Sequence, residues 1–160
     1  MGKPLFKNLS TEKQQKIIQS KAFRNYDLSH SELRYADLRG ADFRQVNLFK
    51  TDLFHSYLSG SDLRQSDLRE ANLKKADLRE ADLREADLTK ADLREANLTK
   101  ANLTKANLFK ADLTAADLSR VKLIGANLIG ANLSWANLTK ANLTSADLTG
   151  VITEINVLTF

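Results

Sequence analysis

The sequence contains no cysteine, one proline and six glycines among its 160 residues. Without cysteine, the chain can form neither a disulfide framework nor a thiolate metal site. It also lacks any apolar run of the length that a membrane-spanning helix or a signal peptide needs. These absences predict a soluble, cytoplasmic protein, and the chain length suffices for one domain with a buried core.

A strong excess of either charge is missing as well. The formal net charge is +4, and residues 1–20, with four lysines against one glutamate, supply +3 of it. Residues 21–150 hold 20 Lys or Arg against 18 Asp or Glu, so the charge of this segment is nearly balanced. A balanced surface gives no reason to expect a nucleic-acid partner or a protein that imitates a polyanion. Nothing in the sequence predicts a membrane contact.

The sequence does contain a leucine or phenylalanine at every fifth position from Phe23 to Leu148. In an α-helix, five residues turn the chain by about 500°, so successive leucines would lie about 140° apart and would form no apolar face. In a continuous strand, side chains alternate between two faces, so an odd spacing would place successive leucines on opposite sides. The chain must therefore change direction once in every five-residue unit.

Residues 21–150 divide into 26 such units without an insertion, and each unit has a small, a polar, a large, a first outer and a second outer position. The large position is Leu in 24 units, the small position is Ala in 17, and the polar position is Asp or Asn in 22. In an extended segment the small and large residues point inward and the polar residue points outward. The outer residues then form a corner, where the glycines at second outer positions tolerate a positive φ. This pattern requires a closed all-β solenoid with stacked leucines inside, while the number of its sides stays open.

The repeat A-(D/N)-L-x-x resembles the motif of the pentapeptide-repeat family, and the resemblance covers about 130 of the 160 residues. It implies the fold of that family, a right-handed quadrilateral β-helix. On this fold the 26 units would form about 6.5 coils. The family is especially abundant in cyanobacteria, where many members have no assigned activity.

The two ends of the chain depart from the repeat, and a solenoid needs caps because its terminal coils expose core and unpaired backbone. The segment 9–20 predicts a short helix that caps the first coil, and Thr11 followed by Gln14 is a capping-box pattern. Residues 151–160 are rich in apolar side chains and form either a cap or a contact with another chain. We therefore divide the chain into an N-terminal cap (1–20), the solenoid (21–150) and a C-terminal cap or contact segment (151–160).

No group of residues predicts catalysis or a metal site. His30 and His55 both fall at corners, where we expect them to be solvated. The aspartates belong to the repeat, where their side chains can bond nearby backbone or pair with arginine, so choosing two as an acid and a base would be arbitrary. The sequence has no phosphate-binding glycine loop and no hydrolase or metalloprotease motif. We expect a protein that is not an enzyme and that uses no cofactor.

Apolar residues at outward positions are informative, because the repeat offers polar alternatives there and exposed apolar patches often mark interfaces. One group lies within residues 49–57 and a second lies towards the C-terminus. The candidate protein-contact residues are Phe49, Phe54, Tyr57, Phe109, Ile124, Ile129 and Trp135.

Charged residues also form columns if four units make one coil, because residues twenty apart then stack. The arginines of one column should be neutralised by aspartates two positions earlier; this column begins with Arg24, Arg44, Arg64 and Arg84. A corner column has little acid nearby and forms a candidate anion-contact ridge, although solvated side chains are the favoured explanation. Its residues are Lys100, Arg120 and Lys140.

These patterns favour a non-enzymatic structural or protein-interaction scaffold that contacts a protein partner or a second copy through its apolar groups or its C-terminal end. The family resemblance implies an alternative, because quinolone-resistance members imitate duplex DNA and bind DNA gyrase. That mimicry needs a strongly negative surface, which the balanced repeat does not provide. A gyrase-binding regulator is therefore the disfavoured alternative.

Overall fold

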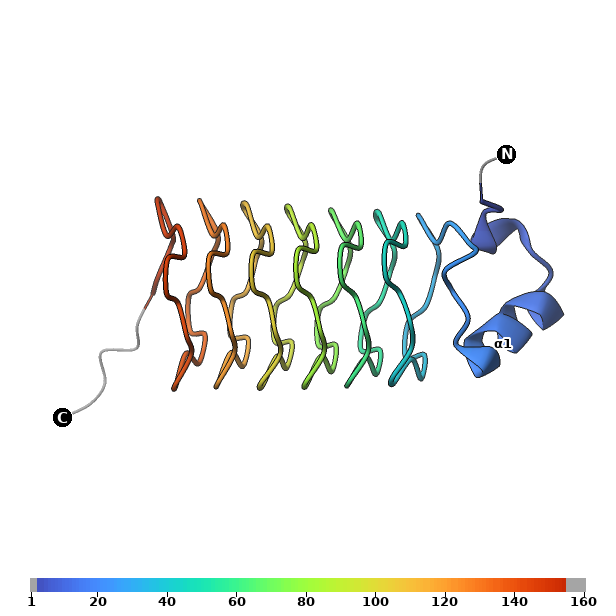
Figure 1. Ribbon diagram of the computed structural model, residues 1–160, viewed down its shortest axis with the longest axis horizontal. Coiled ribbons are helices and arrows are strands. Elements are labelled where there is room, and N and C mark those ends of the chain that lie inside the picture. The colour runs from blue at the N-terminus through green and yellow to red at the C-terminus, as the bar shows by residue number, and fades with distance from the viewer. Residues whose placement is uncertain (1–2, 155–160) are drawn as a thin grey trace.

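The computed structural model describes residues 3–154, so most of the expected C-terminal segment, residues 155–160, lies outside the description. Figure 1 shows a rod of stacked coils with helical segments at its N-terminal end. The helical elements are the 3-10 helix η1 (Phe6–Asn8) and the α-helix α1 (Thr11–Ser20). Within residues 3–154, the β-structure consists of isolated parallel bridges between coils, because each edge is straight for only a few residues.

The register of the bridges fixes the number of sides. Polar residues twenty positions apart pair along the rod, as in Asp42 with Asp62 and Asp62 with Asp82. Twenty residues are four units, so each coil has four edges and each edge stacks on the equivalent edge of the next coil. The N-terminal segment differs, because Leu5 pairs with Asp27 at an offset of 22 and so takes the place of a preceding coil.

Every backbone N–H of a regular unit has an acceptor, which explains the composition of the repeat. In one central unit, the N–H of Ala86 donates within the preceding corner (3.1 Å), that of Asp87 to the preceding coil (3.0 Å), and those of Leu88 and Lys90 to the following coil (2.7 and 2.9 Å). The N–H of Thr89 faces neither coil and donates instead to Oδ1 of Asp87 (3.0 Å). Asp or Asn at the polar position therefore supplies the one acceptor that the backbone lacks.

The corners depend on a left-handed backbone conformation at the second outer position. From His30 to Gly150, each of these residues has a φ between 54° and 66°. Glycine adopts this conformation without a steric cost, but most of the corners carry Lys, Glu, Gln or an aromatic residue. Since the N–H of each interior corner residue bonds the next coil, the stacking holds non-glycine residues in a conformation that they would avoid in an isolated chain.

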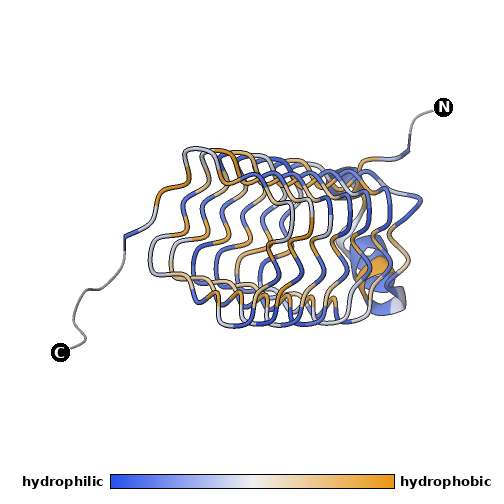
Figure 2. Ribbon diagram, turned by 60° about the vertical axis from the view of Figure 1, so that its left-hand side comes forward, coloured by the Kyte–Doolittle hydropathy of each residue, from blue (hydrophilic) through white to orange (hydrophobic). Residues whose placement is uncertain are grey.

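The core is a column of large residues that fills the inside of the rod. The leucines at large positions from Leu28 to Leu128 are buried, with at most 2% of their surface exposed. Figure 2 shows how hydrophobic and hydrophilic residues alternate along the coil edges. Phe23 and Phe43 replace leucine in neighbouring coils and stack with ring centroids 4.5 Å apart. The interior is therefore packed with side chains and offers no space to a substrate.

Helix α1 and the segment before it cover the first coil. Phe6 and Ile17 are buried in the hydrophobic core, and the ring of Phe6 lies 6.4 Å from that of Phe23. The start of α1 differs from the expected capping box, because Ser10 is the N-cap residue and its side chain makes no capping bond. The Gln14 side chain instead donates from Nε2 to the carbonyl of Phe6 (3.0 Å), which ties the helix to η1.

Candidate functional site

The C-terminal end of the rod is the most exposed part of its core. Leu128 is fully buried, but Leu138 and Leu143 are partly exposed and Leu148 is 43% exposed. Ile152, at a polar position of the repeat, is 54% exposed. These residues follow the same pattern as the interior, so their exposure arises because no described coil or helix lies over them.

The backbone at this end also lacks partners within residues 3–154. In the interior, the N–H of each large residue donates to the following coil, as Leu128 does to the carbonyl of Asp147 (2.8 Å). No described residue accepts the N–H groups of Leu143 and Leu148. An edge whose N–H groups have no acceptor among the described residues, beside exposed leucines, is a template for pairing with another chain.

A second apolar surface lies on the N-terminal half and consists of Tyr35, Phe54, His55 and Tyr57. The ring of Tyr35 meets that of Phe54 edge-on at 5.6 Å and stacks on that of His55 at 5.5 Å, while His55 lies 6.5 Å from Tyr57. Tyr35 is 58% exposed. The structure therefore joins two of the expected contact residues through His55 and adds Tyr35, which the sequence analysis missed although it precedes His55 by twenty residues.

Phe49 lies apart from this cluster, on the preceding face of the rod. Its half-buried ring meets that of His30 edge-on at 5.5 Å. The ammonium group of Lys50 and the guanidinium group of Arg69 lie 5.1 and 5.5 Å from the ring centre. These cations stabilise the exposed face of the ring by cation–π contacts. Part of the exposed ring surface of Phe49 is therefore explained by contacts within the chain and does not require a partner protein.

The C-terminal apolar residues are distributed over several positions around the rod. Phe109 and Ile129 lie in one column, and Ile124 lies on the adjoining face; all three are half-buried. Trp135 is 45% exposed and occupies a corner further round the coil. Its backbone N–H donates to the carbonyl of Glu154 (3.1 Å), so Trp135 lies beside the open C-terminal end.

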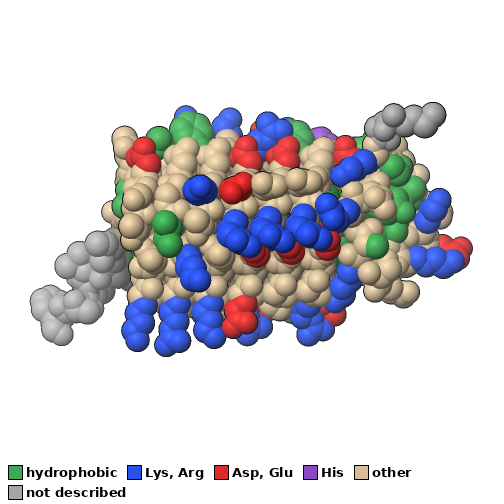
Figure 3. Space-filling view, viewed as in Figure 1, with side chains coloured by type: hydrophobic (Ala, Val, Ile, Leu, Met, Phe, Trp, Pro, Cys, Tyr) green, Lys and Arg blue, Asp and Glu red, His purple; other side chains and the backbone are tan. Residues whose placement is uncertain are grey.

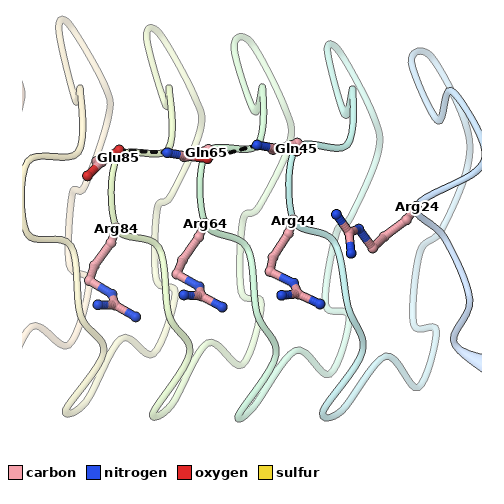
Figure 4. A pocket seen from close by; sticks show the side chains of 7 residues that line it. All are labelled: Arg24, Arg44, Gln45, Arg64, Gln65, Arg84 and Glu85. Carbon is pink, nitrogen blue, oxygen red and sulfur yellow. Dashed lines mark hydrogen bonds between the residues drawn. The ribbon is translucent and has the colours of Figure 1, made fainter.

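The arginine column lies on one face beside a ladder of hydrogen-bonded amide and carboxylate groups (Figure 4). Arg44 binds Asp42 through Nε (2.9 Å) and Nη2 (2.6 Å), and Arg64 binds Asp62 in the same way. The hydrogen bond from Arg44 lowers the pKa of Asp42 to about 2 and raises the pKa of the guanidinium. These aspartates stay ionised at neutral pH and are occupied by structural bonds, so none is free to act as a general acid.

The corner ridge of Lys100, Arg120 and Lys140 contains fewer ion pairs than the arginine column. Figure 3 shows a row of basic side chains along one edge of the rod towards its C-terminal end. Lys100 pairs with Glu80 (3.0 Å), whereas no described carboxylate lies within ion-pair distance of Arg120 or Lys140. The ridge therefore carries two basic groups that have no carboxylate partner among the described residues.

Neither a metal site nor a membrane segment emerges from the described part of the chain. No three His, Asp or Glu side chains of residues 3–154 gather as ligands for a metal ion. None of the helices in the same range is both long and apolar enough to cross a bilayer.

The repeat is shared with a known protein family. A family model of pentapeptide repeats matches with eight copies, over residues 23–48, 47–84, 76–114 and 116–152. The chain belongs to the pentapeptide repeat family. The match spans the coils described above and identifies a repeat rather than a catalytic domain.

Several solved pentapeptide repeat structures resemble the chain. A protein from the Arabidopsis thaliana thylakoid lumen is 36% identical over 61% of this chain and 68% of its own, with a TM-score of 0.59. HetL, a protein involved in heterocyst differentiation regulation in the cyanobacterium Nostoc, is 36% identical over 80% of this chain and 66% of its own, with a TM-score of 0.36. A trypsin-treated form of QnrB1, a plasmid-mediated fluoroquinolone resistance protein, is 24% identical over 78% of this chain and 77% of its own, with a TM-score of 0.52.

The structural similarity to the Arabidopsis protein and to QnrB1 bears on the fold and not on a role. The chain spans about two thirds of the length of the Arabidopsis protein and of HetL. At 24% identity, the likeness to QnrB1 shows a shared fold alone. No curated protein matches the chain.

Proposed function

We propose that this pentapeptide repeat protein is a non-enzymatic scaffold that contacts another protein chain, and that its open C-terminal end is the principal contact surface. The observation that carries the proposal is the exposure of Leu138, Leu143 and Leu148 on a coil whose outward N–H groups have no described acceptor. A second copy of the chain is the simplest occupant, because two such ends bring apolar surface and unpaired backbone to the same interface. A partner protein with an exposed strand edge is the other occupant that the surface suits.

The absence of an enzyme activity belongs to the same proposal, and two features of the described residues support it. The interior is filled by leucine, which leaves no enclosed space in which a substrate could react. The repeated carboxylates bind backbone N–H groups and arginines, as Asp42 does with Arg44, so they serve the fold rather than proton transfer.

The lateral apolar residues form the secondary part of this proposal. We expect the cluster that contains Phe54 and Tyr57 to contribute a contact, since two of its rings are largely exposed. Trp135, beside the open end, would extend the principal surface. The remaining candidates are half-buried and would contribute less; they are Phe49, Phe109, Ile124 and Ile129.

The proposal also includes the division of the chain and its setting. We infer that residues 1–20 form a cap, that residues 21–150 form the solenoid, and that residues 151–160 form a C-terminal cap or contact segment. The right-handed sense of the coil follows from the family resemblance. The expected cytoplasmic location stays a prediction, and one solved relative comes from the thylakoid lumen.

Sedimentation equilibrium of two matched variants tests the principal surface. Leu148→Asp places a charge among the exposed leucines, whereas Thr144→Asp changes an exposed first outer residue of the same coil. We expect the wild type and Thr144→Asp to form dimers and Leu148→Asp to weaken the dimer at least about tenfold, because a carboxylate in an apolar interface is desolvated. The proposal would be contradicted by two results together: a single-chain mass for the wild type in sedimentation, and equal recovery of partner proteins by the two variants in an affinity pull-down.

The alternative of a gyrase-binding DNA mimic has little support. The Arg44 and Arg64 guanidinium groups lie directly on the aspartates of the same face, so this face does not present a row of free negative charge. A DNA supercoiling assay with gyrase should show no inhibition by the purified protein.

A further inference from the structure

The first arginine of the column has lost the carboxylate that its neighbours use. In the units of Arg44, Arg64 and Arg84, the polar position is an aspartate, whereas the unit of Arg24 has Ala22 at this position. Ala22 is exposed, and its backbone still pairs in register with Asp42. The backbone frame of the repeat is therefore present at Ala22, but its acidic side chain is not.

Because Ala22 stands at the polar position, three donors of Arg24 lack the acceptor that the repeat normally provides. In the next coil, Asp42 accepts the backbone N–H of Arg44 (3.1 Å) as well as its Nε (2.9 Å) and Nη2 (2.6 Å). No described residue accepts a hydrogen bond from Arg24, and its nearest carboxylate oxygen is that of Asp42, 4.0 Å away. That oxygen already binds Arg44, so Arg24 shares a charge that is largely neutralised.

The direction of the side chain agrees with this loss. Figure 4 shows Arg44, Arg64 and Arg84 lying parallel, whereas Arg24 extends in a different direction along the rod. The parallel arrangement follows from the bond to the aspartate of each unit, and Arg24 has no such bond to orient it. Its guanidinium is thus free to turn towards an acceptor supplied from outside.

A hollow of about 580 Å³ is lined by this unit, by the unit of Arg44 and by the N-terminal cap, and four of its nine lining residues are basic. Besides Arg24 and Arg44, it includes Lys3 and Lys21, while Asp42 is the only acidic residue among the described residues that line it. No described carboxylate lies within ion-pair distance of Lys3, and Lys21 comes only within 4.0 Å of Asp37. Within residues 3–154, two cations, those of Lys3 and Arg24, are therefore left without a close counterion.

We propose that this hollow binds a phosphate-type oxyanion at the place where the missing carboxylate of Ala22 would lie. One oxygen of the anion would accept the N–H and Nε of Arg24, and a second would accept Nη2, as the two oxygens of Asp42 do with Arg44. The ammonium group of Lys3 would supply the second positive charge, which favours a dianion over a monocarboxylate.

Arg34, an arginine at the same position of the repeat on another face, does have a close carboxylate. Arg34 also lacks an aspartate in its own unit, since the polar residue is Glu32. Its guanidinium, however, lies 3.6 Å from Asp52 and 4.8 Å from the ring centre of Phe54. Arg34 thus has a close carboxylate and an aromatic neighbour, which is why the proposal concerns Arg24.

Titration of the full-length chain with inorganic phosphate, at constant ionic strength set by chloride, tests the site. Binding is followed by calorimetry and by amide NMR shifts of residues 21–25 and 42–45. We expect Arg24→Gln and Ala22→Asp each to weaken binding on the order of tenfold or more, the first by removing the donors and the second by supplying an internal competitor. Arg84→Gln is the matched control, since Arg84 is already bound by Asp82, and should change binding less than about twofold.

Two outcomes would overturn the proposal: Ala22→Asp binding phosphate as well as the wild type, or Arg84→Gln losing as much affinity as Arg24→Gln. Thermal melts of each variant show whether it remains folded, and Ala22→Asp should melt no lower than the wild type because it completes the pattern of the repeat. O-phosphoserine serves as a second probe. Tighter binding of this ester would point to a phosphorylated side chain as the source of the anion, and equal binding to free phosphate.

Discussion

The two ends of the rod carry the same repeat but have different exposure. At the N-terminal end, Phe6 and Ile17 cover the first coil, and the large residue Phe23 is fully buried. At the C-terminal end, Leu148 occupies the same position of the repeat and is 43% exposed. The motif therefore determines which side chains point inward, whereas burial depends on whether another layer lies over the coil. This difference makes the C-terminal end, and not the regular centre, the place to seek a partner.

The two halves of the rod also differ in their surface charges. Arginine and aspartate form direct pairs from Asp37 to Arg94. In the later coils the polar position is mostly Asn, and lysines such as Lys140 have no described carboxylate partner. Asn accepts the same backbone N–H that Asp accepts, as shown by Asn107 and the N–H of Phe109 (3.2 Å). The backbone thus tolerates either residue, and the choice between them sets the charge of the surface.

The largest effect should separate the centre of the rod from its open end. Leu88→Asp would bury an unpaired carboxylate among leucines and should lower the free energy of unfolding by more than about 4 kcal/mol. In the monomer, Leu148→Asp changes an equivalent but exposed residue and should cost about 1–2 kcal/mol. Urea unfolding of both variants, at a protein concentration low enough for the chain to be monomeric, measures the difference, and equal losses would show that the chain itself buries the end as completely as the centre.

Acid should weaken the N-terminal half before the C-terminal half. Hydrogen bonds from arginine hold the pKa of Asp42 at about 2, below its ordinary value of 3.8, and they also lower those of Asp62, Asp67 and Asp77. These pKa values are lower in the folded chain than in the unfolded chain. The ionised aspartates therefore stabilise the fold at a pH above their ordinary pKa, and this contribution is lost as the pH falls through 4 towards 2. The polar positions from residue 97 onwards are mostly Asn, which does not titrate. Asp117 is an exception: burial raises its pKa, but hydrogen bonds from Ser119 and Thr99 lower the pKa overall.

Native-state hydrogen exchange at pH 6 and near pH 2.5 measures this contrast coil by coil. Protection factors should fall more for the amides within residues 37–94 than for those within residues 97–133. A uniform fall along the rod would indicate that the paired aspartates stabilise the fold as a whole, or that their contribution is small because they are partly solvated.

The smallest effect should come from single ion pairs at the corners. Lys100→Gln removes the exposed pair with Glu80 and should change the free energy of unfolding by less than about 0.5 kcal/mol. Lys140→Gln, with no described partner, provides the control and should have a similar small effect. A loss above about 1 kcal/mol for Lys100→Gln alone would show that this corner stabilises the rod.

Much of the fold could be predicted from the sequence, because each position of the repeat has one physical requirement. The spacing of Leu88 and its equivalents excludes a helix and a flat sheet, and the pattern around it correctly placed the inward and outward residues. The corners were only partly foreseen: glycines indicated a positive φ, yet residues such as Trp135 adopt it too, with a φ of 64°. The start of α1 was misplaced, since local capping patterns compete with contacts such as that between Gln14 and Phe6.

The candidate sites were less predictable, because they depend on residues that the register brings together. Tyr35 escaped notice, although it stacks on His55 in the next coil. The separation of Phe49 from Phe54 also depends on which face each unit occupies.

The sequence by itself determined that the chain closes into a leucine-filled solenoid, because a five-residue period permits no simpler regular structure. It also determined the outward position of Asp42 and its equivalents. Only the tertiary structure decided that there are four sides, that the C-terminal coil lies open within the described residues, and that Arg24 has no described acceptor where Arg44 has three bonds. The reason is that these features depend on pairing between residues twenty apart and on what covers each end, and neither is encoded within a single unit.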